Sequence, residues 1–133
     1  MKHHVNGLQV FGTAVLIISV FVTGCKPEYE SLSIEPKTNA PKAMTLNEER
    51  IVITEGIAVL VEVEPVSGSR RDFGYDTKIE LESKDDEVFE ALPTDDDDEF
   101  VLIGVTPGET CMDVWVADEH RECISVQVSA AEG

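Results

Sequence analysis

The chain has 133 residues, of which 27 are acidic and 10 basic, and its formal net charge at pH 7 is −17. So acidic a chain repels nucleic acid and anionic lipid headgroups, and both are disfavoured as partners. Its Val, Ile and Leu residues come in regular short blocks, which argues against intrinsic disorder. The length suits one folded domain with its own core.

The beginning of the chain has the pattern of a secretory signal peptide. Met1 to His4 carry one lysine and no acid, and an apolar run from Val10 to Val22 follows. As a helix rising about 1.5 Å per residue, that run covers roughly 20 Å, short of the ~30 Å hydrocarbon core of a bilayer. A charged start, a short apolar middle and small residues before a cleavage site favour a signal peptide over a membrane span.

The apolar run ends on a cysteine. The stretch Val22-Thr23-Gly24-Cys25 resembles the lipobox of bacterial lipoproteins, where a dedicated signal peptidase cuts before the cysteine. The resemblance implies that residues 1–24 are a removed signal peptide and that Cys25 carries a diacylglycerol, often with a further acyl chain. Stable anchoring needs more than one chain, since each buried methylene contributes about 0.8 kcal/mol. The alternative is a plain signal peptide that merely contains a cysteine.

The lipobox resemblance also implies a location. The protein would be held at the cell envelope, attached to the membrane through Cys25, with residues 25–29 as anchor and short tether. Lys26 replaces the aspartate that retains some lipoproteins at the inner membrane, which favours the outer membrane. After cleavage, 9 basic residues would remain against 27 acidic ones, a formal charge of −18.

The remaining sequence predicts short β-strands separated by turn residues. Apolar and polar residues alternate within these blocks, so each strand has one face to bury. Pro65 is expected to end the third strand, residues 65–76 to form a loop, residues 38–47 a polar loop or insertion, and residues 118–122 a polar hairpin tip. About eight strands without a convincing amphipathic helix predict an all-β sandwich. The expected strands are 31–35, 50–54, 57–64, 78–82, 88–92, 100–105, 110–117 and 123–128.

These blocks resemble the group 2 bacterial immunoglobulin-like domain of bacterial surface and envelope proteins. The matching segments are "SLSIEP", "VITEGIAVLVEVEP", "IELESKDDEVFEAL", "FVLIGVTPGETCMDVWV" and "CISVQV". They cover roughly residues 30–129 and leave 130–133 as a C-terminal tail. The resemblance implies an immunoglobulin-like β-sandwich of about seven to eight strands. The chain departs from the family near Ile79 or Leu81, where the tryptophan common in the family's third strand is missing, and at residues 95–99, which replace a glycine turn.

Two cysteines remain once Cys25 is assigned to the lipid. Alternation places Cys111 and Cys123 on outward faces, where we expect them opposite each other across an antiparallel hairpin, with Asp113 opposite Arg121. Cross-strand Cβ atoms lie about 4.5–5.5 Å apart, which local twist can close to a disulfide. Free thiols are one alternative. A zinc site with His120 is another, but it lacks a fourth ligand and would lie in an oxidising compartment.

The sequence contains no recognisable catalytic motif. His120 is the one histidine after residue 24, and we expect it at an exposed tip. Neither a Gly-x-Ser-x-Gly, a His-Glu-x-x-His nor a phosphate-loop pattern occurs. The carboxylates lie in turns and on outward faces rather than as an evident acid–base pair. We therefore expect a non-catalytic binding or structural module, with an envelope protein or a polysaccharide as partner.

Two groups of residues are candidates for a contact surface. Trp115 is predicted to face outward, where it either marks a binding patch or covers the disulfide. Arg70 and Arg71, with Phe73 and Tyr75, form a local basic and aromatic cluster. That cluster either meets an acidic partner or glycan, or belongs to a loop held by internal salt bridges.

The acidic run Asp95, Asp96, Asp97, Asp98 and Glu99 offers the oxygen ligands that Ca²⁺ takes. It lacks the alternating ligands and glycine of an EF-hand loop, and a solvated turn that keeps strand edges soluble is favoured. The alternative function is a Ca²⁺-responsive surface module. We predict at most weak Ca²⁺ binding by calorimetric titration; a micromolar affinity that Asp96→Asn and Asp98→Asn abolish would contradict this.

Overall fold

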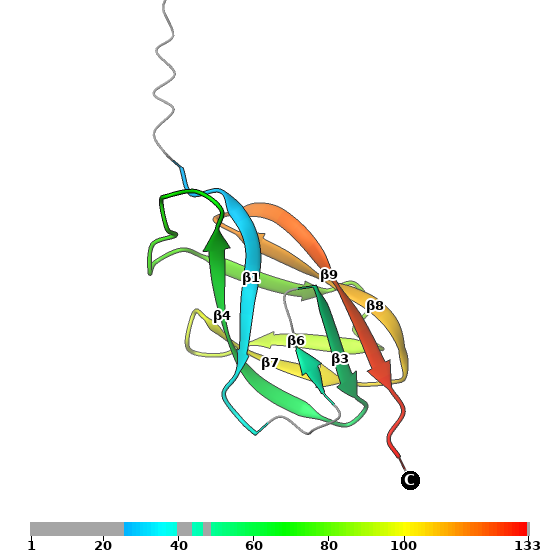
Figure 1. Ribbon diagram of the computed structural model, residues 1–133. Helices are drawn as coiled ribbons and strands as arrows, with labels where there is room; N and C mark the ends of the chain where they lie inside the picture. The colour runs from blue at the N-terminus through cyan, green and yellow to red at the C-terminus, as the bar shows by residue number, and fades with distance from the viewer. Residues whose placement is uncertain (1–25, 40–43, 47–48, 133) are drawn as a thin grey trace, which may run out of the picture.

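Two β-sheets pack face to face in the computed structural model, which describes residues 26–39, 44–46 and 49–132 (Figure 1). Cys25 and the expected signal peptide lie outside these residues. Within them, no helix is long and apolar enough to cross a membrane. The strands are β1 (Tyr29–Pro36), β2 (Thr45–Leu46), β3 (Arg50–Thr54), β4 (Ala58–Ser67), β5 (Ile79–Ser83), β6 (Phe89–Pro93), β7 (Glu99–Gly104), β8 (Gly108–Val116) and β9 (Glu119–Ser129).

The order of the strands is that of an immunoglobulin domain. One sheet runs β1-β4-β7-β6 and the other β2-β3-β9-β8-β5. With β1 as strand A and β4 to β9 as B to G, the sheets are A-B-E-D and G-F-C, the arrangement of constant-type domains. The β3–β9 pair is parallel. The predicted immunoglobulin-like β-sandwich is confirmed, and β2 is a short strand within the region expected to be a loop or insertion.

The core lies between the sheets and follows the predicted alternation. Alternate residues are buried along the middle of β4 and the second half of β9, and Met112, Val114 and Val116 are buried in β8, where Asp113 between them is buried as well. Each fully buried aliphatic or aromatic side chain contributes roughly 1.5–3 kcal/mol, so the sandwich is held mainly by these faces. The largest buried side chains are Phe89, Leu32, Ile51, Ile53, Leu102, Met112 and Ile124, followed by Val59, Val61, Val63, Val114 and Val116.

Strand β4 does not end at Pro65, as the sequence suggested, but continues to Ser67. The β4–β7 ladder ends where the Val63 N–H donates to the Asp98 carbonyl. On the side of β1, the Lys37 N–H donates to the Leu60 carbonyl. Because every second residue of β4 bonds to β1, the even-numbered residues do so and the Pro65 nitrogen points away from β1. The missing N–H of proline therefore removes no ladder bond.

The β8–β9 hairpin is tighter than expected. It turns on Ala117 and Asp118, whose φ angles of 53° and 63° are both positive, as a two-residue type I′ turn requires. Strand β9 consequently begins at Glu119, and all of the expected polar tip except Asp118 is part of the strand. A bulge follows, because Trp115 pairs with His120 while Val114 pairs with Glu122.

This register corrects the expected position of the disulfide. Cys111 lies opposite Ser125, and Cys123 lies opposite Asp113, so the expected direct pairs Cys111–Cys123 and Asp113–Arg121 are wrong. The turn at Ala117 and the bulge together shift β9 by two residues. The disulfide still forms, as a diagonal bond between residues whose Cα atoms are 5.4 Å apart.

The disulfide closes a loop with a sequence separation of 12 residues. The chain-entropy model gives about 3 kcal/mol for such a loop. We expect Cys111→Ala combined with Cys123→Ala to lower the free energy of unfolding by that amount in urea denaturation of residues 26–133. Reductant should destabilise the parent protein similarly and leave the double variant unchanged. A double variant as stable as the oxidised parent would contradict this.

Candidate binding groove at the edge of the sandwich

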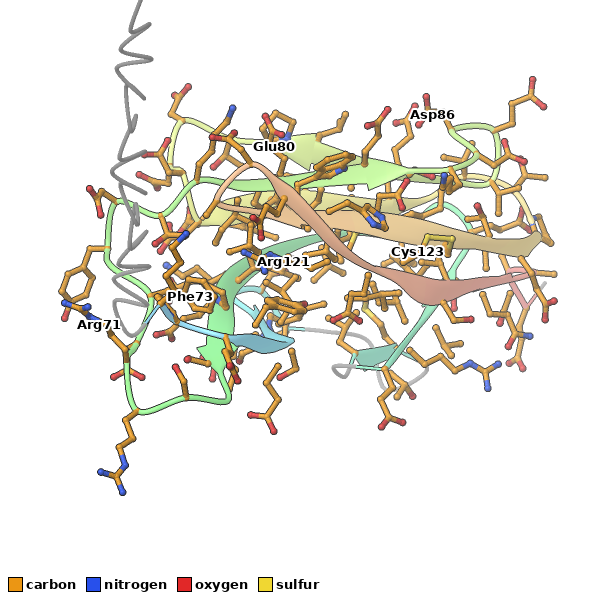
Figure 2. The ribbon with its side chains drawn as sticks, turned by 90° about the horizontal axis from the view of Figure 1, so that it is seen from above. Arg71, Phe73, Glu80, Asp86, Arg121 and Cys123 are labelled. Carbon is orange, nitrogen blue, oxygen red and sulfur yellow. A yellow bond between two sulfur atoms is a disulfide. The ribbon has the colours of Figure 1, made fainter. Side chains whose placement is uncertain are left out.

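A groove of about 780 Å³ lies where the two sheets present free edges on the same side. Strand β5 is the last strand of one sheet and β6 of the other. Figure 2 shows Glu80 projecting from β5 on the outer side. The groove is lined by Asp76, Thr77, Lys78, Ile79, Glu80, Leu81, Glu82, Pro93, Thr94, Asp96, Asp97, Phe100 and Trp115.

The groove brings together two features that are separate in the sequence. Trp115 comes from β8, while Asp96 and Asp97 come from the turn between β6 and β7. Trp115 lies opposite Glu80 in the β5–β8 register, and its ring meets the His120 imidazole edge-on, with ring centroids 5.1 Å apart. The half-buried indole is thus fixed on one side and faces the groove.

The charge of the groove is strongly negative. Five of its thirteen lining residues are acidic and one, Lys78, is basic. The Lys78 ammonium lies 3.0 Å from Glu80 and 3.5 Å from Asp118, and its hydrogen bond with Glu80 raises its pKa. Because this cation is already paired, the excess of carboxylates determines the sign of ligand that the groove favours.

The acidic run forms the tight turn that leads into β7, and its carboxylates have different surroundings. The Thr94 hydroxyl accepts from the Asp96 N–H at 3.1 Å and lies 3.1 Å from the Glu99 carbonyl. Asp96 and Asp97 line the groove, whereas Glu99 pairs with Lys37. The Lys37 hydrogen bond lowers the pKa of Glu99, and the hydrogen bond with Glu99 raises the pKa of Asp96.

In the part of the chain that the structure describes, no three His, Cys, Asp or Glu side chains come close enough together to hold a metal ion. Asp95 and Asp98 are exposed on the same turn. Ca²⁺ binding by the acidic run therefore stays a prediction for titration.

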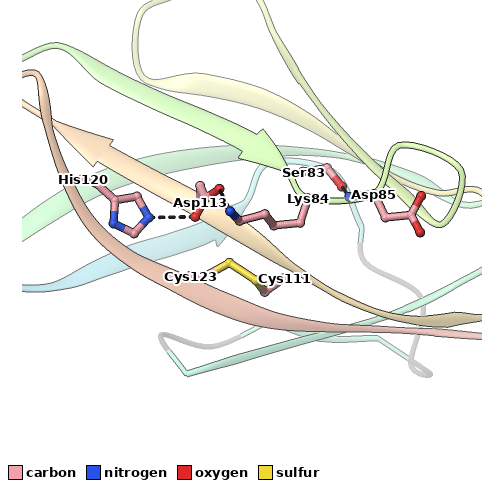
Figure 3. Close-up of a disulfide and its surroundings, with 7 residues drawn as sticks. All are labelled: Ser83, Lys84, Asp85, Cys111, Asp113, His120 and Cys123. Carbon is pink, nitrogen blue, oxygen red and sulfur yellow. Dashed lines mark hydrogen bonds and ion pairs between the residues drawn. A yellow bond between two sulfur atoms is a disulfide. The ribbon is translucent and has the colours of Figure 1, made fainter.

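A buried carboxylate supports the side of the groove formed by β8. Asp113 is 8% exposed and lies 2.7 Å from His120 Nε2 and 3.3 Å from the Lys84 ammonium. Figure 3 shows both side chains converging on it beside the disulfide. Burial acts to raise the pKa of Asp113, but the hydrogen bonds with His120 and Lys84 outweigh burial and leave the pKa below its usual value.

We expected His120 at a hairpin tip, but it lies within β9, because the turn is shorter than the sequence suggested. Its pairing with Asp113 resembles the base-and-carboxylate half of a catalytic triad. The neighbouring sulfur atoms of Cys111 and Cys123 are bonded to each other and supply no thiol nucleophile. What the pair does here is hold the ring against which Trp115 packs.

The basic and aromatic cluster lies in the loop between β4 and β5 and does not line the groove. Arg70, Arg71 and Tyr75 are exposed, whereas Phe73 is partly buried because it packs against the core. The loop is attached to the first described residues: Gly68 N–H donates to Glu28 O at 2.8 Å. Figure 1 shows it at the end where the described chain begins.

Sequence reasoning missed two sets of residues. The alternation in the sequence identifies Glu80 and Glu82 as outward-facing residues, but only the order of the strands shows that they lie on an edge strand. The bulge turns Arg121 toward Tyr29, with the guanidinium carbon 5.8 Å from the ring centroid, and the Tyr29 hydroxyl donates to Glu122 at 2.6 Å. No signal in the sequence marks that bulge.

No family model matches the chain, and no curated protein matches it. Among solved structures, the chain is similar in fold to domains of the surface layer protein SbsC. A structure of SbsC domains 1–6 matches 81% of this chain with a TM-score of 0.55 and 12% identity, and domains 5–6 match 81% with a TM-score of 0.52 and 13% identity. The chain spans 14% and 47% of those two SbsC structures. At such identities the similarity to SbsC shows the fold alone.

The contacts of Asp113 predict a pH-dependent stability. A carboxylate with a lowered pKa in the folded state stabilises it above the ordinary value of about 3.9, and this contribution is lost as the pH falls through the lower folded value. Asp113→Asn should therefore reduce the free energy of unfolding by about 1–2 kcal/mol at pH 7, and by less at pH 3. Urea denaturation at both pH values measures the difference. Glu109→Gln, an exposed carboxylate of β8, is the control; an equal loss in both variants would contradict the role of Asp113.

Proposed function

We propose that this is a lipid-anchored protein of the bacterial cell envelope whose group 2 immunoglobulin-like sandwich is a non-catalytic binding module. The observation that carries the proposal is the acidic groove beside β5, with Trp115 fixed at its wall. Clefts that combine an aromatic side chain with a few charged groups are the usual form of binding sites.

The chain geometry at the domain's start supports a short-range role. Lys26 directly follows Cys25, and β1 begins at Tyr29, so the span from Cys25 to the first strand is at most roughly 14 Å. The Ser69 hydroxyl lies 3.3 Å from the Glu28 nitrogen and 3.5 Å from the Lys26 carbonyl. A lipid on Cys25 would hold such a domain close to the membrane surface. Its partner would then be another component of the same envelope, and the outer membrane is the membrane we propose.

Two further observations support a binding role over a catalytic one. The sulfurs beside the histidine–carboxylate pair of the described ranges are bonded to each other, so that pair has no adjacent thiol to activate. The fold similarity is to a protein named as a surface layer protein. That analogy favours a location outside the cytoplasm but identifies no ligand.

The anchor is tested by substituting the cysteine. We expect the full chain expressed in a Gram-negative bacterium to incorporate labelled palmitate and to sediment with membranes. Cys25→Ser should do neither, because it removes the thiol that takes the diacylglycerol. The Cys111→Ala and Cys123→Ala variant is the matched control and should keep the label. A Cys25→Ser protein that still sediments with membranes and carries the label would overturn the proposed anchor.

Protease treatment of intact and lysed cells then identifies the compartment of the binding partner. Digestion in intact cells would make the groove available to molecules outside the cell. Protection until lysis would make it periplasmic. In either case, a photo-crosslinking residue at Thr94 in the groove, compared with one at Glu109, should capture a partner that the second position does not.

A further inference from the structure

We propose that the groove takes an extended, basic segment of a partner protein, which adds as a new antiparallel strand to the free edge of β5. The inference rests on the binding function proposed above and names the chemistry of its ligand. Two features support it: the backbone groups on the unpaired side of β5, and the carboxylates around that strand.

The backbone of β5 has one unpaired side. Ala117 N–H donates to Lys78 O at 2.9 Å, and Lys84 N–H donates to Cys111 O at 3.0 Å. These bonds fix the alternation of the ladder, so the even-numbered residues of β5 bond to β8. The N–H and C=O groups of Ile79 and Leu81 therefore point to the other side, where no strand in the described part of the chain pairs with β5, although β6 of the other sheet lies nearby. An added strand would satisfy these groups.

The side chains beside this edge specify the charge of the segment. A residue directly opposite Glu80 or Glu82 in an added strand shares their outer face, and an opposite charge there is favourable. Trp115, which neighbours Glu80 on β8, offers an indole face to a lysine or arginine. Asp96 and Asp97 supply further negative charge from the β6–β7 turn. Residues opposite Ile79 and Leu81 share the inner face, where apolar side chains fit.

The same charges exclude the most obvious competitor, a second copy of this chain. If β5 paired with β5 in the register centred on Leu81, Glu80 of each copy would face Glu82 of the other. Like charges directly opposite are destabilising, and two chains of charge −17 also repel at longer range. Charged edge strands are a common protection against self-association. Here the protection leaves the edge open to a strand of the opposite sign.

The probe is a synthetic hexapeptide of alternating lysine and valine, titrated into the protein while the fluorescence of Trp115 is followed. Trp115 is the one tryptophan of the chain, so the signal reports this groove. We expect saturable binding that weakens with salt, and no binding of a peptide of alternating glutamate and valine. Glu80→Gln combined with Glu82→Gln should weaken binding at least tenfold. The control pair Glu35→Gln and Glu109→Gln removes the same charge from exposed positions outside the groove and should change affinity less than twofold.

Backbone methylation of the peptide distinguishes strand addition from simple charge attraction. With lysines opposite Glu80 and Glu82, the valines lie opposite Ile79 and Leu81, and their N–H groups bond to β5. N-methylation of the valines should therefore abolish binding, whereas N-methylation of the lysines should leave it within threefold. Urea denaturation of each variant confirms that it is folded.

The outcomes separate this inference from the function on which it rests. Equal binding of the two methylated peptides would overturn strand addition and leave a charge-selective groove in place. No binding of the lysine–valine peptide, or no loss with the Glu80 and Glu82 variant, would overturn the ligand chemistry as well. The lipid anchor and the binding role in the envelope are tested independently, by palmitate labelling and by crosslinking from Thr94.

Discussion

The register of the β8–β9 hairpin determines where the side chains of the five-stranded sheet lie relative to the groove. A side-chain period of two means that a slip of one residue would move every residue of β9 to the opposite face. The two-residue turn at Ala117 and Asp118 and the single extra residue at Arg121 set this register. They bring His120 onto Asp113 and keep the valines of β9 in the core. The disulfide then closes diagonally across the hairpin.

Asp113 links this hairpin to the edge of the sheet. A carboxylate that is 8% exposed loses much of its hydration, and it is tolerable because His120 and Lys84 both approach it. Lys84 directly follows β5, so its ion pair helps to hold the end of the edge strand against β8. His120 in turn supports the Trp115 ring. One buried charge therefore positions both the strand and the aromatic side chain that border the groove.

The sequence was informative about burial and much less informative about neighbours. Alternating valines identified β4, β8 and β9 with their correct faces, because burial of one face imposes the period directly. Pro65 was misleading, since its effect depends on where β7 stops pairing. The turn at Ala117 was hidden, because it uses neither the glycine nor the asparagine that normally marks a type I′ turn. The groove was not predictable, because Trp115 and Asp96 meet only through the order of the strands in two sheets.

The negative charge of the chain has two effects at the edge strand β5. Carboxylates at exposed strand positions and turns cost little in water, and on β5 they discourage pairing with another copy. The same carboxylates lower the free energy of a bound strand that carries lysine or arginine. A neutral edge with the same backbone would pair with many extended segments, including its own. The glutamates of β5 thus give specificity by repulsion as well as by attraction, which is how a small sandwich with an open groove can select a partner.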